Sequence, residues 1–247
     1  MIEIYNEKVQ DLLVKPNLRP KEGLNVREHP TKGVYVEEAK FVPVTSYLEI
    51  QNQIDMGTEN RTIGSTNMNA TSSRAHTVSM IIFKQRYFGP DGKPERELVS
   101  NINLIDLAGS ERAGSTGAEG ARLAEGANIN KSLMILGKVI STLAKNAGKS
   151  GAGLAVVPYR ESKLTFILKP FLGGNAKTSM VAALSPASIN YDETLGTLKY
   201  AWQVKAIKNV AVINESASDK MIRELKEEIE RLKMGGGAIA GGGGALS

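Results

Sequence analysis

The chain has 247 residues, of which 41% are hydrophobic and 23% are charged. These ordinary globular values exclude a wholly disordered chain or a fibrous repeat, and they allow one large domain or two small ones. The chain has no cysteine, which excludes disulfides, zinc-thiolate sites and a cysteine nucleophile. The two histidines, His29 and His76, are too few for a histidine metal cluster, and the net charge of +5 favours acidic partners only weakly.

The two ends of the chain differ in character. The first residues carry no signal-peptide pattern, and no apolar run in the chain reaches the ~18 residues needed to span a bilayer. We therefore predict a cytoplasmic protein with no direct membrane partner. Residues 234–247 are half glycine, a composition that predicts a disordered tail.

In chain order, the first predicted elements are short. Residues 1–5 have the pattern of a strand, and residues 6–13 that of a short helix displaying Val9 and Leu12. Two β segments are expected at residues 34–36 and 41–44. A helix is expected over residues 46–56, with Ser46 as N-cap, Glu49 at the capping-box position and Gly57 at its end.

The rest of the chain alternates strands and longer helices. Residues 77–87 and 98–106 are separated by a turn-rich segment and predict a β-hairpin. The apolar run at residues 178–185 predicts a buried strand. This alternation is typical of an α/β domain with a mixed central sheet flanked by helices. The expected helices cover residues 125–147, 160–172, 190–207 and 218–233.

The last predicted helix, residues 218–233, has a separate character. Ile222, Leu225, Ile229 and Leu232 are spaced by 3, 4 and 3 residues, as in a coiled coil. Two heptads are too short to be stable alone. Weak dimerisation through this helix and a single docked helix both remain open.

Two polar segments carry the chemistry. Asp106 ends an apolar strand and Gly109 follows three residues later, which suits a carboxylate holding Mg²⁺ through water and a backbone N–H meeting a γ-phosphate. Upstream, the adjacent hydroxyls of Ser72 and Ser73 suit Mg²⁺ and a phosphate oxygen. Arg74 has the charge to pair with Glu111, and such a pair would latch two loops together when the γ-phosphate is present.

These segments resemble the two switch motifs of kinesin motor domains. Residues 69–76 (NATSSRAH) are similar to switch I, and residues 106–111 (DLAGSE) to switch II. The resemblance continues through residues 125–133, 157–165 and 190–195, and it runs from Met1 to about Lys233. It implies the C-terminal part of the kinesin P-loop NTPase fold. The implied organisation is a partial motor domain over residues 1–208, a neck linker over 209–217 and a neck helix over 218–233.

The resemblance also implies roles for single residues. ATP with Mg²⁺ would be the cofactor, with Ser73 and Asp106 at the metal. Arg74 and Glu111 would position the attacking water. The nucleotide-binding positions implied are Asn69, Ser72, Ser73, Asp106 and Gly109.

The implied partner is the microtubule, with no nucleic acid expected. Basic residues would meet the acidic surface of tubulin, and they are Arg27, Lys32, Lys131, Arg160 and Lys163. Residues 26–37 and 66–69, together with the neck helix, are similar to the vesicle-transporting, often monomeric branch of kinesins.

A P-loop, GxxxxGK[ST], is not found in these 247 residues. The one Gly-Lys-Ser, at residues 148–150, has Leu143 where the first glycine should stand, and a helix rather than a strand precedes it. We therefore expect a truncated motor domain without ATPase activity of its own, whose strand ending at Asp106 lacks a neighbour on one side. A non-hydrolytic microtubule-binding fragment and a non-functional remnant are the alternatives.

Overall fold

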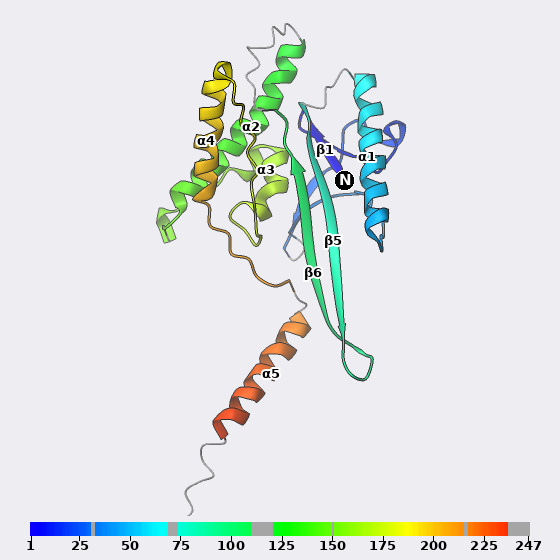
Figure 1. Ribbon diagram of the computed structural model, residues 1–247, viewed down its shortest axis with the longest axis vertical. Helices are drawn as coiled ribbons and strands as arrows, with labels where there is room; N and C mark the ends of the chain where they lie inside the picture. Colours follow the sequence, from blue (N-terminus) through cyan, green and yellow to red (C-terminus); the bar gives the residue numbers. More distant parts are fainter. Residues whose placement is uncertain (31–32, 69–73, 110–120, 150, 215–216, 237–247) are drawn as a thin grey trace, which may run out of the picture. The chain divides into compact units, whose positions relative to one another are not determined.

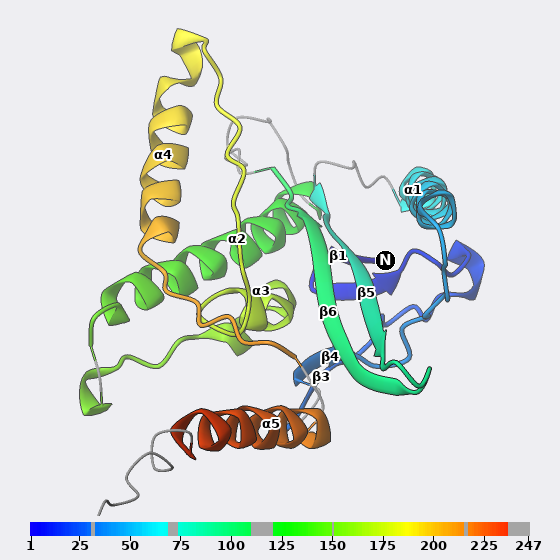
Figure 2. The same cartoon turned by 60° about the horizontal axis from the view of Figure 1, so that its bottom comes forward.

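A computed structural model describes residues 1–30, 33–68, 74–109, 121–149, 151–214 and 217–236 (Figures 1 and 2). The chain divides into two compact units. The first contains Met1–Met80 and Asn103–Val212, and the second contains Ile81–Ile102 and Ile213–Ser247. None of the helices in the described ranges is long and apolar enough to cross a membrane.

The chain opens with a β-hairpin. β1 (Ile2–Tyr5) pairs antiparallel with β2 (Lys8–Asp11), so that Ile2 faces Asp11 and Tyr5 faces Lys8. Asn6 and Glu7 form the turn with positive φ angles of 50° and 59°, the conformation that a two-residue hairpin turn requires. The helix expected over residues 6–13 is therefore wrong, because the chain reverses at Asn6 and Glu7 before a helical turn can form.

The main sheet has the strand order β2-β1-β5-β6. β5 (His76–Phe88) pairs antiparallel with β1, and β6 (Pro94–Asp106) follows β5 through a short turn, as the sequence predicted. β6 forms one edge of this four-stranded sheet, so the prediction that the strand ending at Asp106 lacks one neighbour is confirmed within the described strands. A second, two-stranded sheet pairs β3 (Val26–His29) with β4 (Gly33–Val36).

Helix α1 (Tyr47–Met68) is twice as long as expected. Its start matches the prediction, since the Ser46 hydroxyl accepts the Glu49 N–H at 3.3 Å and the Glu49 carboxylate accepts the Thr45 N–H at 2.6 Å. Gly57 does not end it. A Cβ at Gly57 would lie 2.5 Å from the sulfur of Met1, so this glycine permits a close approach between α1 and the first residue.

The remaining helices largely follow the sequence pattern. Helix α1 lies on one side of the main sheet, and α2 (Ala121–Asn146) and α3 (Lys163–Leu168) lie on the other (Figures 1 and 2). The helix expected over residues 160–172 is broken, because Ser162 caps a new helix and Pro170 favours a tighter turn. The other described α-helices are α4 (Tyr191–Lys205) and α5 (Ala217–Gly236), and short 3-10 turns cover Pro16–Leu18, Gly151–Gly153, Tyr159–Glu161, Lys169–Phe171 and Ser188–Asn190.

Two predicted strands are absent from the described sheets. Residues 41–44 and 178–185 form no strand, and Val181 is 94% exposed. An apolar run becomes a buried strand only where a neighbouring strand supplies backbone partners. Residues 178–185 have no such neighbour in the described sheets, and the prediction of a buried strand there is wrong.

The core of the first unit lies between the sheets and two helices. β1, β2 and β5 contribute one side of it, and α2 and α3 contribute the other. Its fully buried residues follow the period of two in the strands and of 3.6 in the helices. They include Ile2, Ile4, Val9, Val78, Val139, Ile140 and Leu164.

Candidate functional site

The two predicted switch segments meet at one end of the main sheet. β5 begins at His76, directly after Arg74 and Ala75, and β6 ends at Asp106. Since the two strands form a hairpin, the start of β5 and the end of β6 lie side by side (Figure 1). The hairpin therefore brings together segments that lie 30 residues apart in the sequence.

His76 joins these segments to helix α2. Its Nδ1 accepts the backbone N–H of Ala108 at 3.0 Å, and its Nε2 lies 2.8 Å from the Ser132 hydroxyl oxygen. Because a backbone N–H can only donate, Nδ1 is the unprotonated nitrogen and Nε2 carries the hydrogen toward Ser132. His76 is 2% exposed and Ser132 is 3% exposed, so water does not compete for these bonds.

The electrostatics of His76 agree with this tautomer. Burial lowers the pKa of the imidazole from its ordinary value of 6.5 to about 4, and the negative charge of Asp106 acts in the opposite direction. The ring is therefore neutral at neutral pH, as acceptance of the Ala108 N–H requires.

Asp106 and Gly109 frame the end of β6. The Asp106 side chain is exposed and accepts no hydrogen bond from any residue in the described ranges, while Gly109 is half-buried. A carboxylate with uncommitted oxygens is the donor that Mg²⁺ prefers, so this position fits the implied metal. Arg74, also half-buried, lies at the other segment's end.

Several predicted residues lie outside the described ranges. The proposed pairing of Arg74 with Glu111, and the hydroxyl contributions of residues 72 and 73, therefore stay predictions. The residues concerned are Lys32, Asn69, Ser72, Ser73 and Glu111.

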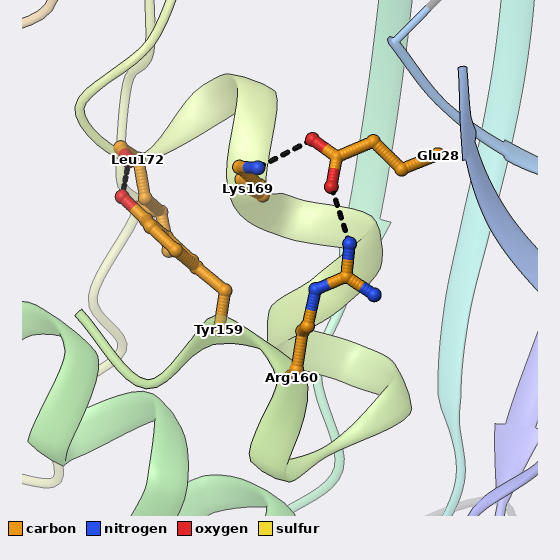
Figure 3. A network of polar contacts seen from close by, with 5 residues as sticks. All are labelled: Glu28, Tyr159, Arg160, Lys169 and Leu172. Atoms are coloured by element: carbon orange, nitrogen blue, oxygen red, sulfur yellow. Dashed lines mark hydrogen bonds and ion pairs between the residues drawn. The ribbon is translucent and has the colours of Figure 1, made fainter. Parts of the chain in front are cut away.

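The predicted microtubule-binding residue Arg160 belongs to a network around Glu28 (Figure 3). The Glu28 carboxylate accepts Arg160 Nη2 at 2.7 Å through one oxygen and the Lys169 ammonium through the other. These two bonds hold the pKa of Glu28 below its usual range, with Lys169 the larger cause. The guanidinium of Arg160 also lies 4.5 Å from the centre of the Phe166 ring.

The other basic residues fall into two places. Arg27 lies beside Glu28 in β3 and pairs with Glu37 at 3.2 Å. Lys163 begins α3, and its backbone N–H donates to the Glu7 carboxylate at 2.8 Å, which leaves its ammonium for other partners. Lys131 is exposed on α2, next to Ser132. The structure thus gathers Arg27, Arg160 and Lys163 near β3 and α3, and it places Lys131 beside the His76 contact.

Neither the Glu28 network nor the contacts of His76 can be predicted from a local sequence pattern. Glu28 and Lys169 were not singled out, because two oppositely charged residues 141 positions apart carry no local pattern. The sequence motif places His76 only at the end of the first switch-like segment. A histidine opening an otherwise apolar strand is a weak signal that its ring enters the core and needs two polar partners.

Comparison with known proteins settles the family. The family model described as the kinesin motor domain matches residues 1–207. The chain belongs to the kinesin motor domain family. The predicted α/β fold with a central sheet and flanking helices is confirmed, but neighbouring strands of the described main sheet are antiparallel, whereas a mixed sheet was predicted.

Individual kinesins place the chain within the family. It is 56% identical over 232 residues to Kinesin-related protein 1 of Dictyostelium discoideum and 55% identical over 237 residues to Kinesin-like protein KIF1B of Rattus norvegicus. It is 52% identical to Kinesin-like protein unc-104 of Caenorhabditis elegans. Each match covers 94% of this chain but only 10–14% of the relative. These relatives confirm the predicted resemblance to the vesicle-transporting branch of kinesins.

Solved kinesin structures agree with the fold. A KIF14 dimer with AMP-PNP in complex with a microtubule has a TM-score of 0.79 and 45% identity, over 91% of this chain and 62% of that one. A fast kinesin has a TM-score of 0.74 and 41% identity, over 88% and 57% of the two chains.

Proposed function

We propose that this chain supplies the γ-phosphate-sensing and microtubule-binding part of an ATP-driven motor domain. The observation that carries the proposal is the meeting of the two switch segments at His76 in a chain of the kinesin family. The KIF14 structures, bound to microtubules with AMP-PNP or ADP, support both the nucleotide and the partner.

In this proposal each residue of the site has a role toward Mg²⁺, the γ-phosphate or the attacking water. Asp106 and Ser73 hold Mg²⁺ through water, and Gly109 offers its backbone N–H to the γ-phosphate, with Asn69 and Ser72 completing the contacts. Bound Mg²⁺ would neutralise the charge that develops on the phosphate oxygens. Arg74, paired with Glu111, positions the attacking water.

The affinity of these 247 residues for Mg-ATP should be low. We propose that these 247 residues alone bind Mg-ATP weakly and do not hydrolyse it, because no GxxxxGK[ST] segment is available to cradle the β-phosphate. Isothermal titration of the chain with Mg-ATP should detect no micromolar binding. A micromolar dissociation constant would overturn this part of the proposal.

Microtubule binding is tested by co-sedimentation. The wild-type chain should pellet with microtubules, and Lys131→Glu and Lys163→Glu should each weaken binding several-fold, because both reverse a charge that faces acidic tubulin. Lys163→Glu leaves the backbone bond to Glu7 in place. Lys15→Glu, which changes an exposed charge elsewhere, is the matched control and should bind as wild type does.

The outcomes separate the candidate functions. Pelleting without ATPase activity matches the proposal for the isolated chain. Loss of pelleting with every variant and with wild type would favour a non-functional remnant. Equal weakening by Lys15→Glu would show that only the net charge matters.

A further inference from the structure

His76 holds three elements together through two short bonds. It begins β5, its Nδ1 accepts the N–H of Ala108 just after β6, and its Nε2 faces the Ser132 hydroxyl in α2. Ala108 directly precedes Gly109, the residue that the proposed function places at the γ-phosphate. A displacement of Gly109 therefore shifts the Ala108 N–H and, through it, Nδ1 of His76.

The imidazole is suited to transmit such a displacement. Its ring is planar and rigid, so movement of Nδ1 moves Nε2 with it. Because His76 and Ser132 are buried, water cannot replace either bond. Breaking a bond would therefore leave a buried polar atom unpaired, which costs free energy. Ala75, Ala108 and Val139 are also buried and limit the alternative positions of the neighbouring backbone and helix.

We propose that His76 is a positioning residue that couples the segment around Gly109 to helix α2 through the Ala108 N–H and the Ser132 hydroxyl. This coupling rests on the proposed function for its biological meaning, since it gives γ-phosphate sensing a direct connection to a helix carrying the predicted microtubule residue Lys131. It needs no contact beyond the two described bonds.

Amide hydrogen exchange of the full 247-residue chain tests the coupling. His76→Leu removes both bonds, and the Ala108 amide should exchange roughly five- to tenfold faster. His76→Asn keeps an acceptor bonded to Cγ, as Nδ1 is, but lacks the ring nitrogen that faces Ser132, so Ala108 should exchange more slowly than in His76→Leu and about as fast as in Ser132→Ala. Ser132→Ala does not touch Ala108, yet it should accelerate exchange there several-fold by releasing the imidazole.

A second substitution on α2 provides the control. Thr142→Ala removes a hydroxyl that donates to Lys138 O one turn earlier in the same helix, and exchange at Ala108 should not change. In the His76→Asn background, Ser132→Ala should have no further effect on Ala108, because the connecting Nε2 is gone. Nitrogen-15 spectra of the imidazole should show a protonated Nε2.

The failures of the two proposals are distinguishable. Equal Ala108 exchange in wild type, His76→Asn and Ser132→Ala, or a protonated Nδ1, would overturn the coupling even if His76→Leu does not fold. A wild-type chain that does not pellet with microtubules would overturn the proposed function and leave the exchange results standing.

Discussion

At the scale of single residues, two side chains without a catalytic role organise the site. His76 connects the ends of β5 and β6 to α2, and Glu28 holds Arg160 and Lys169. His76 lies in the core, where desolvation lowers its pKa. Glu28 lies nearer the surface, where another anion can compete with its carboxylate for Arg160 and Lys169.

The buried imidazole makes stability depend on pH. Between pH 6.5 and about 4 the unfolded chain binds a proton at His76 that the folded chain excludes, so the free energy of unfolding should fall as the pH falls through this window. The full loss is on the order of 3 kcal/mol. Urea unfolding followed by circular dichroism at pH 7, 5.5 and 4.5 measures it.

His76→Asn is the reference for this measurement, because asparagine does not titrate. The variant should lose less stability than wild type over the same pH range. Parallel pH profiles for the two proteins would contradict the assignment of a neutral, buried imidazole.

Glu28 should restrain Arg160 in binding to an acidic partner. Glu28→Gln removes the carboxylate that holds Arg160 and Lys169, so microtubule affinity should rise about two- to fivefold at low salt and return toward the wild-type value at high salt. Co-sedimentation over a range of salt concentrations measures this. Glu22→Gln, on an exposed residue paired with Lys8, makes the same change of charge and should have a smaller effect.

At the scale of elements, β6 is the exposed edge of the described sheet. The last residues of β6 carry exposed apolar side chains on both faces of the strand, since Leu104 is 55% exposed and its neighbour Ile105 is also exposed. An edge strand with apolar side chains on both faces is a template for pairing with another chain. We therefore expect this edge to promote self-association of the chain.

Charge on the edge should suppress that pairing. Leu104→Lys should keep the chain monomeric at concentrations where wild type forms larger species, because a lysine must be desolvated before two edges can pair. Size-exclusion chromatography with light scattering measures the distribution. Leu18→Lys, at another exposed leucine, is the control, and equal improvement there would indicate a general effect of charge.

At the scale of the whole molecule, the kinesin match stops at residue 207 and α5 follows it. Within the second unit, α5 exposes the apolar stripe of Ile222, Leu225, Ile229 and Leu232. The stripe and its charged flanks favour a helix that associates with a second copy, although five turns provide few contacts.

The expected self-association through α5 is weak and removable. Ile229→Lys should abolish any dimer seen by sedimentation equilibrium at high micromolar concentration, since it places a charge in the middle of the stripe. Met234→Lys adds the same charge off the stripe and should leave the dimer intact. A dimer that survives Ile229→Lys would locate the interface elsewhere.

Strong periodicity made much of the fold predictable. The hairpin of β5 and β6, the long helix α2 and the helices α4 and α5 all follow apolar spacing that their own residues specify. The predictions of a helix end at Gly57 and of a strand at residues 178–185 are wrong because distant parts of the chain decide both structures. Gly57 lies within α1, where it makes room for the sulfur of Met1. An apolar run such as residues 178–185 forms a buried strand only beside a neighbouring strand.

Sequence patterns single out candidate residues for the site but do not predict the contacts that connect them. Asp106, Gly109 and Arg74 stand in recognisable patterns, and the hairpin places them at one end of the sheet. The bonds of His76 to Ser132 and of Glu28 to Arg160 span 56 and 132 positions, so they depend on the finished packing of helices against sheets.

The bond between Glu7 and Lys163 has a consequence during synthesis. Glu7 lies in the turn of the first hairpin, and its carboxylate accepts a hydrogen bond from the Lys163 N–H, which is synthesised 156 residues later. At 5–20 residues per second, a ribosome needs roughly ten to thirty seconds to supply that partner. Until α3 has been synthesised, the apolar residues of the first hairpin that pack in the same core remain exposed. We therefore expect the growing chain to bind a chaperone during synthesis.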